Sequence, residues 1–179
     1  MARLLGPGPG HPPADADVDG VEALLACHGR IREFLALAAT IATAAQPPPA
    51  EVARAAERVR RYFTEALPLH VEDEERSLLP RLQGREPALD AALGEMSRQH
   101  ADHEPARRAL LATCQELIAH PERHAALAAR LSQETRVLAA ALEPHLQAEE
   151  ALVFPAAHRL LDPTERRAIL TEVRARRSP

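Results

Sequence analysis

The chain has 179 residues, of which 26 are acidic and 22 are basic, and its formal net charge is −4. All 22 basic residues are arginines, and only 2% of the residues are aromatic. Neither the charge nor the capacity for base stacking therefore favours nucleic-acid binding. No stretch is long and apolar enough to span a membrane, and the first residues lack the apolar segment of a signal peptide. We therefore expect a cytoplasmic protein without a membrane or nucleic-acid partner.

Prolines and glycines divide the sequence into helical segments in chain order. Residues 1–17 have the Gly- and Pro-rich composition of a disordered leader, and residues 18–177 are long enough for one domain. Within that domain, apolar residues recur at helical spacing between the breaks. We expect helices over about residues 17–45, 50–83, 87–120, 122–158 and 163–176. This pattern predicts an all-α fold, an up-down-up-down four-helix bundle with a short fifth C-terminal helix.

One motif, H-x3-E-E-x4-P, occurs twice, at residues 70–80 and 145–155. In a helix, residues i and i+4 lie on the same face, so the His and the first Glu of each copy point in one direction. A third H-x3-E pair lies between the two copies, and His28 lies on the apolar face of the first segment. The three pairs are His70 with Glu74, His100 with Glu104, and His145 with Glu149.

These side chains are expected to meet inside the bundle, because antiparallel helices of similar length place the four histidines at about the same level. Burying four imidazoles and three carboxylates without a counter-ion would cost many kcal/mol, whereas a metal cluster neutralises the carboxylates and uses the imidazole lone pairs. The sequence therefore predicts a dinuclear metal site. Its candidate ligands are His28, His70, Glu74, His100, Glu104, His145 and Glu149.

Several positions allow a second interpretation. A single H-x3-E pair is often only a surface ion pair. His103 stands beside Glu104 and could replace it as the second ligand of its helix. Glu75 and Glu150 follow the candidate ligands directly, and we expect them to accept hydrogen bonds from histidine N–H groups or to be solvated rather than to bind metal. The arginine-rich tail at residues 174–177 is expected to be a solvated helix end rather than a binding patch.

These motifs resemble the hemerythrin-like family with its HHE cation-binding motifs, over about residues 18–160. The resemblance implies a non-haem di-iron centre of two iron ions, for which an oxo or hydroxo bridge is one form, with Glu74 and Glu149 as the bridging carboxylates. It also implies binding of oxygen or a related small ligand, such as nitric oxide or peroxide.

The sequence departs from the oxygen carriers of that family. Glu104 stands where a second histidine of the third helix is expected, and an extra carboxylate would stabilise ferric iron and disfavour reversible oxygenation. We therefore expect a cytoplasmic di-iron protein that acts in sensing or iron handling. The alternatives are a di-iron enzyme that removes peroxide or oxidises ferrous iron, and a metal-free helical adaptor. His and Glu do not by themselves select iron over zinc or manganese, and the sequence leaves the oligomeric state open.

Overall fold

The computed structural model describes residues 19–178, which form helices joined by short connections, with no strand among them. The expected leader, residues 1–17, lies outside the described residues. The first half of the described chain contains α1 (Gly20–Thr43), α2 (Pro49–Arg61), η1 (Tyr62–Ala66), α3 (Leu67–Asp73), η2 (Glu74–Leu78) and α4 (Leu79–Leu82). The second half contains α5 (Pro87–Asp102), α6 (Glu104–Ala119), η3 (Pro121–Arg123), α7 (His124–Ala148), η4 (Glu149–Val153), α8 (Phe154–Leu160) and α9 (Pro163–Ala175). The prediction of an all-α fold is confirmed for these residues.

Local signals explain where several helices begin and end. Asp19 precedes α1, and its Oδ1 accepts hydrogen bonds from the backbone N–H groups of Val21 (2.9 Å) and Glu22 (3.2 Å). Asp162 caps α9 in the same way and forms a capping box with Glu165. Both aspartates satisfy backbone donors that the first turn of a helix leaves free. Within residues 19–178, no helix is both long and apolar enough to cross a membrane.

Three turns of π-helix accommodate prolines inside the helical segments. Each turn begins six residues before a proline, and the residue just before that proline donates its N–H to the carbonyl of the first residue of the turn. A proline has no N–H and its ring clashes with the carbonyl four residues earlier, so a wider turn relieves the clash and the helix continues. The turns and prolines are η1 with Pro68, η2 with Pro80, and η4 with Pro155.

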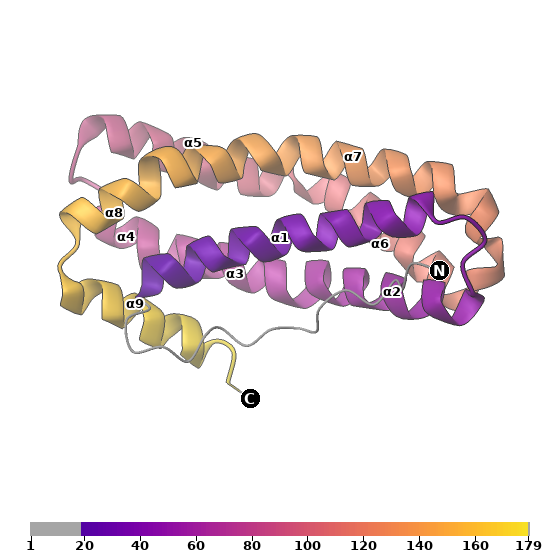
Figure 1. Cartoon of the computed structure of the whole chain (residues 1–179). Helices are drawn as coiled ribbons and strands as arrows, with labels where there is room; N and C mark the ends of the chain where they lie inside the picture. The colour runs from indigo at the N-terminus through magenta and orange to yellow at the C-terminus, as the bar shows by residue number, and fades with distance from the viewer. Residues whose placement is uncertain (1–18, 179) are drawn as a thin grey trace. The chain divides into compact units, whose positions relative to one another are not determined.

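The described chain forms two compact units. The first unit contains residues 30–67 and 103–142, and in it α2 and α6 pack side by side (Figure 1). The second unit contains residues 19–29, 68–102 and 143–178, and all six buried His and Glu side chains described in the next section belong to it.

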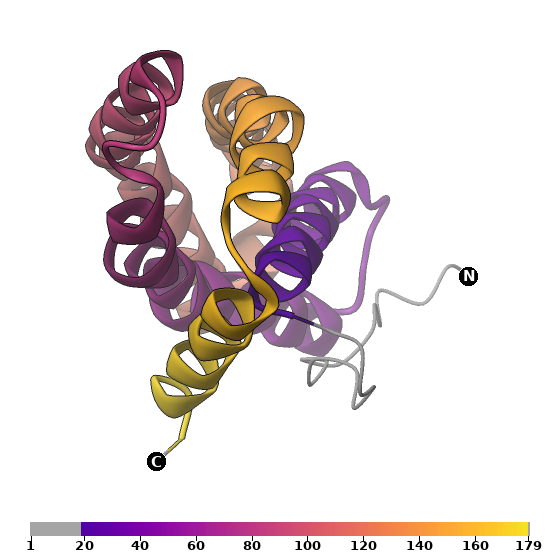
Figure 2. The same ribbon diagram turned by 90° about the vertical axis from the view of Figure 1, so that its left-hand side faces the viewer.

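An apolar core holds the second unit together. In it α4 packs against α5 and α8, and the chain passes from α8 (gold) into α9 (yellow in Figure 2). The side chains of this core come from every helical segment of the unit except α3 and α7. The core residues are Val21, Leu24, Leu78, Leu79, Leu82, Leu89, Leu93, Met96, Val153, Phe154, Ala156, Ala157, Leu161, Ile169 and Val173.

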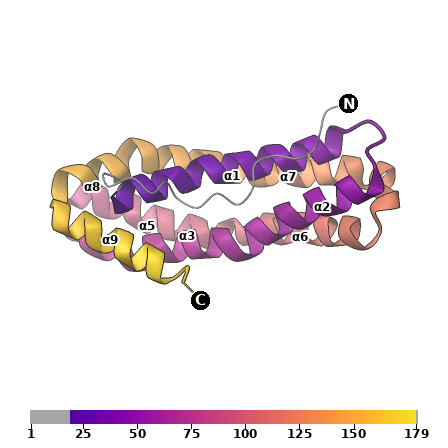
Figure 3. The ribbon, with the colours of Figure 1, turned by 60° about the horizontal axis from the view of Figure 1, so that its bottom comes forward.

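Helix α9 belongs to the second unit and lies along the helix that carries α3 and η2 (Figure 3). The arginine-rich tail at residues 174–177, where α9 ends, was expected to be solvated. This expectation is wrong for two of its residues. Arg176 and Arg177 bind the two carboxylate oxygens of Asp73, at 2.8 and 2.6 Å, and Asp73 is fully buried. Such a partner, 103 residues away for Arg176, leaves no local signal in the sequence.

Close packing of α1 on α9 gives a test of this fold. A Cβ atom at Gly20 would lie 2.5 Å from the Ile169 side chain and 2.8 Å from the Arg166 carbonyl, whereas a Cβ at Gly94 of α5 meets nothing within 4 Å. We expect Gly20→Ala to lower the free energy of unfolding by about 1–3 kcal/mol through overpacking. The control, Gly94→Ala, should raise it by about 0.5–1 kcal/mol, because alanine favours helix more than glycine does. Urea denaturation followed by circular dichroism measures both, and equal effects would contradict the packing.

Candidate metal centre

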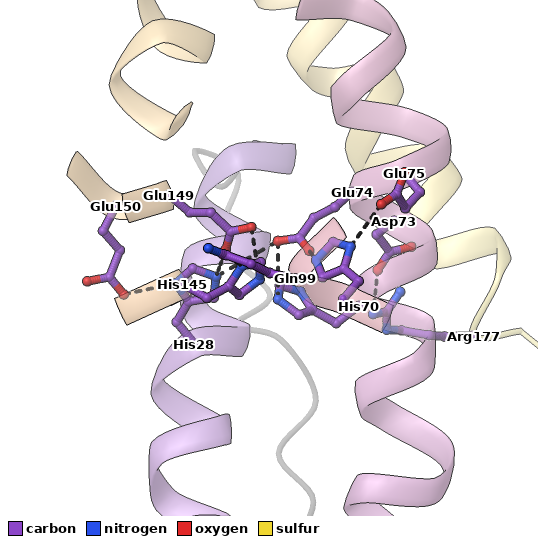
Figure 4. Close-up of polar contacts among 11 residues, drawn as sticks. His28, His70, Asp73, Glu74, Glu75, Gln99, His145, Glu149, Glu150 and Arg177 are labelled. Atoms are coloured by element: carbon purple, nitrogen blue, oxygen red, sulfur yellow. Dashed lines mark hydrogen bonds and ion pairs between the residues drawn. The ribbon is translucent and has the colours of Figure 1, made fainter. Parts of the chain in front are cut away.

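Six of the seven predicted side chains come together in the second unit. His28 lies on α1, His70 on α3, His100 on α5 and His145 on α7, while Glu74 and Glu149 are the first residues of η2 and η4. In Figure 4 the carboxylates of Glu74 and Glu149 lie between the imidazoles of His28, His70 and His145. The side chains are almost fully buried, since the most exposed of them, His100, is 8% exposed.

The six residues form two overlapping groups, each with ligand atoms that lie within 4.8 Å of one another. The first group contains His28 and His70, and we call it the His28–His70 position. The second contains His100 and His145, and we call it the His100–His145 position. Glu74 and Glu149 belong to both groups. Each position therefore offers two imidazole nitrogens and shares two carboxylates with its neighbour, which is the donor set of a carboxylate-bridged dinuclear site.

The nitrogen and oxygen atoms of these groups are close together without forming hydrogen bonds. The Nε2–carboxylate distances are 3.0 Å from His28 to Glu149, 3.2 Å from His70 to Glu74, 3.3 Å from His100 to Glu74 and 3.2 Å from His145 to Glu149. Yet the Nε2 atoms of His28, His70 and His100, and all four carboxylate oxygens, are buried without a hydrogen-bond partner among the described residues. Buried polar atoms of native proteins are normally satisfied. Metal cations between these atoms would satisfy them, so the residues present fit a metal centre.

Hydrogen bonds at the opposite nitrogen orient three of the four imidazoles. The Nδ1 of His28 donates to Glu150 at 2.9 Å, and the Nδ1 of His100 donates to Glu75 at 2.8 Å. Both glutamates were expected either to accept hydrogen bonds from histidines or to be solvated, and the structure shows the first alternative. Because a carboxylate accepts the Nδ1 hydrogen, the neutral form of each ring presents its Nε2 lone pair to the centre.

Sequence reasoning missed the third partner, Gln99, whose Oε1 lies 2.9 Å from the Nδ1 of His145. Gln99 is on α5 and His145 on α7, 46 residues later. No spacing within one helix could have indicated this pair. Its only signal is that Gln99 directly precedes a candidate ligand, His100.

The side chain of Glu104 does not join either group. It binds Arg107 at 2.7 and 2.9 Å, lies 3.5 Å from Arg108 and is 40% exposed. The expectation placed Glu104 above His100 on one continuous helix, but α5 ends at Asp102 and α6 begins at Glu104. Pro105 has no N–H with which to continue the ladder of hydrogen bonds, so the i, i+4 relation fails there. His103, the alternative to Glu104, is buried but belongs to neither group.

Burial and the nearby carboxylates together set the pKa values of the imidazoles in the metal-free protein. Burial disfavours the charged form of His28, but the nearby carboxylates of Glu149 and Glu74 outweigh burial and raise its pKa to about 9. Burial also lowers the pKa of His100, but the nearby carboxylate of Glu74 outweighs burial and raises this pKa to about 9. For His70 burial dominates and lowers the pKa to about 4.

The two glutamates shift in opposite directions because they share one buried space. Burial and the charge of Glu74 raise the pKa of Glu149 to about 8. Burial also acts on Glu74, but the surrounding imidazoles of His70, His100 and His28 outweigh it and lower the pKa of this carboxyl. Two carboxylates this close cannot both be ionised easily without a cation between them.

Metal uptake should therefore displace protons. At pH 7 the cluster of His28, His100 and Glu149 holds protons in the metal-free protein, because the pKa values of these groups are raised to about 9, 9 and 8. Binding through these groups needs their deprotonated forms, so we expect release of about two to three protons per chain and an affinity that strengthens as the pH rises from 6 towards 9. Calorimetric zinc titrations in buffers of different ionisation enthalpy measure the release. Proton release near zero at pH 7 would contradict the assignment.

A comparison with protein families agrees with this geometry. A search of curated proteins found no match for the chain. The family model described as the Hemerythrin HHE cation binding domain matches residues 19–157, which include all six side chains of the two groups and end before α9. The chain belongs to the hemerythrin family of HHE cation-binding domains.

Proposed function

We propose that the chain binds two iron ions at the His28–His70 and His100–His145 positions, with Glu74 and Glu149 as bridging ligands. The observation that carries this proposal is the pair of overlapping groups, whose buried nitrogen and oxygen atoms approach one another without hydrogen bonds. Cations are the class of ligand that the family description names. Glu104 is not part of this proposal, because its carboxylate is paired with arginines.

The molecule that reaches this centre should be small. The imidazoles and carboxylates that form the centre are at most 8% exposed, so a large substrate cannot contact them without local opening. Two iron ions held by these residues would supply two adjacent redox centres that can bind oxygen, nitric oxide or peroxide. We propose binding of such a ligand, in sensing or iron handling, as the function.

The donor set favours ligand binding over the alternative of an enzyme that removes peroxide or oxidises ferrous iron. The expected stabilisation of ferric iron rested on a third carboxylate, Glu104. Four imidazoles and two carboxylates carry less negative charge than a set with three carboxylates, so the ferrous state is less disfavoured.

The proposal extends to the architecture and location of the chain. It takes residues 18–177 as one up-down-up-down four-helix domain with α9 as a short fifth helix. It also places this domain in the cytoplasm.

Two isosteric substitutions test the ligand assignment. After anaerobic reconstitution with ferrous iron, we expect Glu149→Gln to weaken iron binding by at least about 100-fold, because it removes a charged oxygen donor shared by both positions. The matched control, Glu104→Gln, should bind about two irons per chain, as the unmodified protein does. Iron is counted by plasma mass spectrometry after gel filtration, and equal loss of iron in both variants would contradict the assignment.

Absorption spectroscopy tests the binding of a small ligand to the iron-loaded protein. We expect the reconstituted ferrous protein to develop a new charge-transfer absorption band within seconds of mixing with nitric oxide or oxygen, and Glu104→Gln to behave alike. Stopped-flow absorption measures this reaction. An iron-loaded protein whose spectrum does not change with either gas would contradict the proposed ligand.

A further inference from the structure

We infer that the two metal positions differ in affinity, and that the His100–His145 position binds its ion more tightly than the His28–His70 position. This inference rests on the proposed function, because it assumes that both groups bind metal. It concerns the hydrogen bonds behind the imidazoles, which the two positions do not share.

Several surrounding groups are alike at the two positions and cannot make their metal affinities differ. Glu74 and Glu149 serve both groups. Each position also contains one imidazole backed by a carboxylate, His28 by Glu150 at 2.9 Å and His100 by Glu75 at 2.8 Å. A carboxylate behind an imidazole raises the electron density of the ring and strengthens its bond to a metal, to a similar extent in both cases.

The remaining two imidazoles differ. The Nδ1 of His145 lies 2.9 Å from the Oε1 of Gln99, which fixes the ring orientation and the tautomer. The Nδ1 of His70 is buried and has no hydrogen-bond partner among the described residues. A neutral imidazole that offers Nε2 to a metal must carry its hydrogen on Nδ1, and at His70 that buried donor is left unsatisfied. His70 is therefore the weaker of the two donors.

Helix α5 contributes further to the order of the His100–His145 position. Glu75, which backs His100, is itself held, because the Ser97 hydroxyl donates to its Oε2 at 3.0 Å. Ser97, Gln99 and His100 all lie on α5, so one rigid helix supplies a ligand and two of the groups that orient the ligands of this position. Such preorganisation lowers the cost of ordering the site when metal binds. Losing one outer partner typically costs about 10–100-fold in metal affinity, and this sets the expected size of the difference.

Stepwise zinc binding to the metal-free protein tests the inference, since zinc has no redox chemistry to complicate the titration. In competition with a chromophoric chelator, we expect two steps whose dissociation constants differ by about 10–100-fold. Gln99→Leu removes the partner of His145 at similar volume, so it should weaken the tighter step by about 10–100-fold and leave the weaker step nearly unchanged. The control, Gln133→Leu, changes a side chain that bonds only Arg136 among the described residues and should alter neither step.

Imidazole NMR assigns the steps without any substitution. At one equivalent of zinc, the ring nitrogen signals of His100 and His145 should shift before those of His28 and His70. Two equal steps, or signals of His28 and His70 that shift first, would overturn the inference while leaving the dinuclear site intact. Failure of the unmodified protein to bind zinc or ferrous iron at all would instead overturn the proposed function and this inference together.

Discussion

The second unit depends on two carboxylates, Glu74 and Glu149, that are buried side by side among imidazoles. An uncompensated pair of buried charges would cost several kcal/mol per ion, so the chain must supply positive charge at this point. In the metal-free protein protons do so, since the pKa values of His28 and His100 are raised to about 9 and that of Glu149 to about 8. Metal cations can replace these protons at the same atoms, and a buried acid–base cluster is then also a metal centre.

The recurring H-x3-E-E-x4-P motif builds this arrangement twice by the same local means. The proline imposes a turn of π-helix, and the first glutamate, Glu74 or Glu149, opens that turn. The second glutamate reaches a histidine on another helix, since Glu75 backs His100 and Glu150 backs His28. Each copy of the motif thus supplies an imidazole, a shared carboxylate and an orienting carboxylate, which explains why both glutamates and the distant proline belong to the pattern.

Sequence reasoning could predict what depends on local chemistry. The breaks at prolines and glycines bounded the helical segments to within a few residues, and the apolar stripes with the H-x3-E spacing identified the six side chains that the structure brings together. Glu104 was misplaced because the i, i+4 rule assumes an unbroken helix, and α5 ends at Asp102. Gln99 behind His145, and Asp73 between two arginines, could not be found, because tertiary packing alone creates these contacts between residues far apart in the sequence.

The central claim is that two metal ions lie between Glu74 and Glu149, each with two of the four histidines. Crystals of the iron-reconstituted protein, measured on both sides of the iron absorption edge, test it most directly. The account predicts two anomalous peaks per chain within coordination distance of these carboxylates, one near His28 and His70 and the other near His100 and His145. A single peak, or iron bound at Glu104 and away from this cluster, would contradict it.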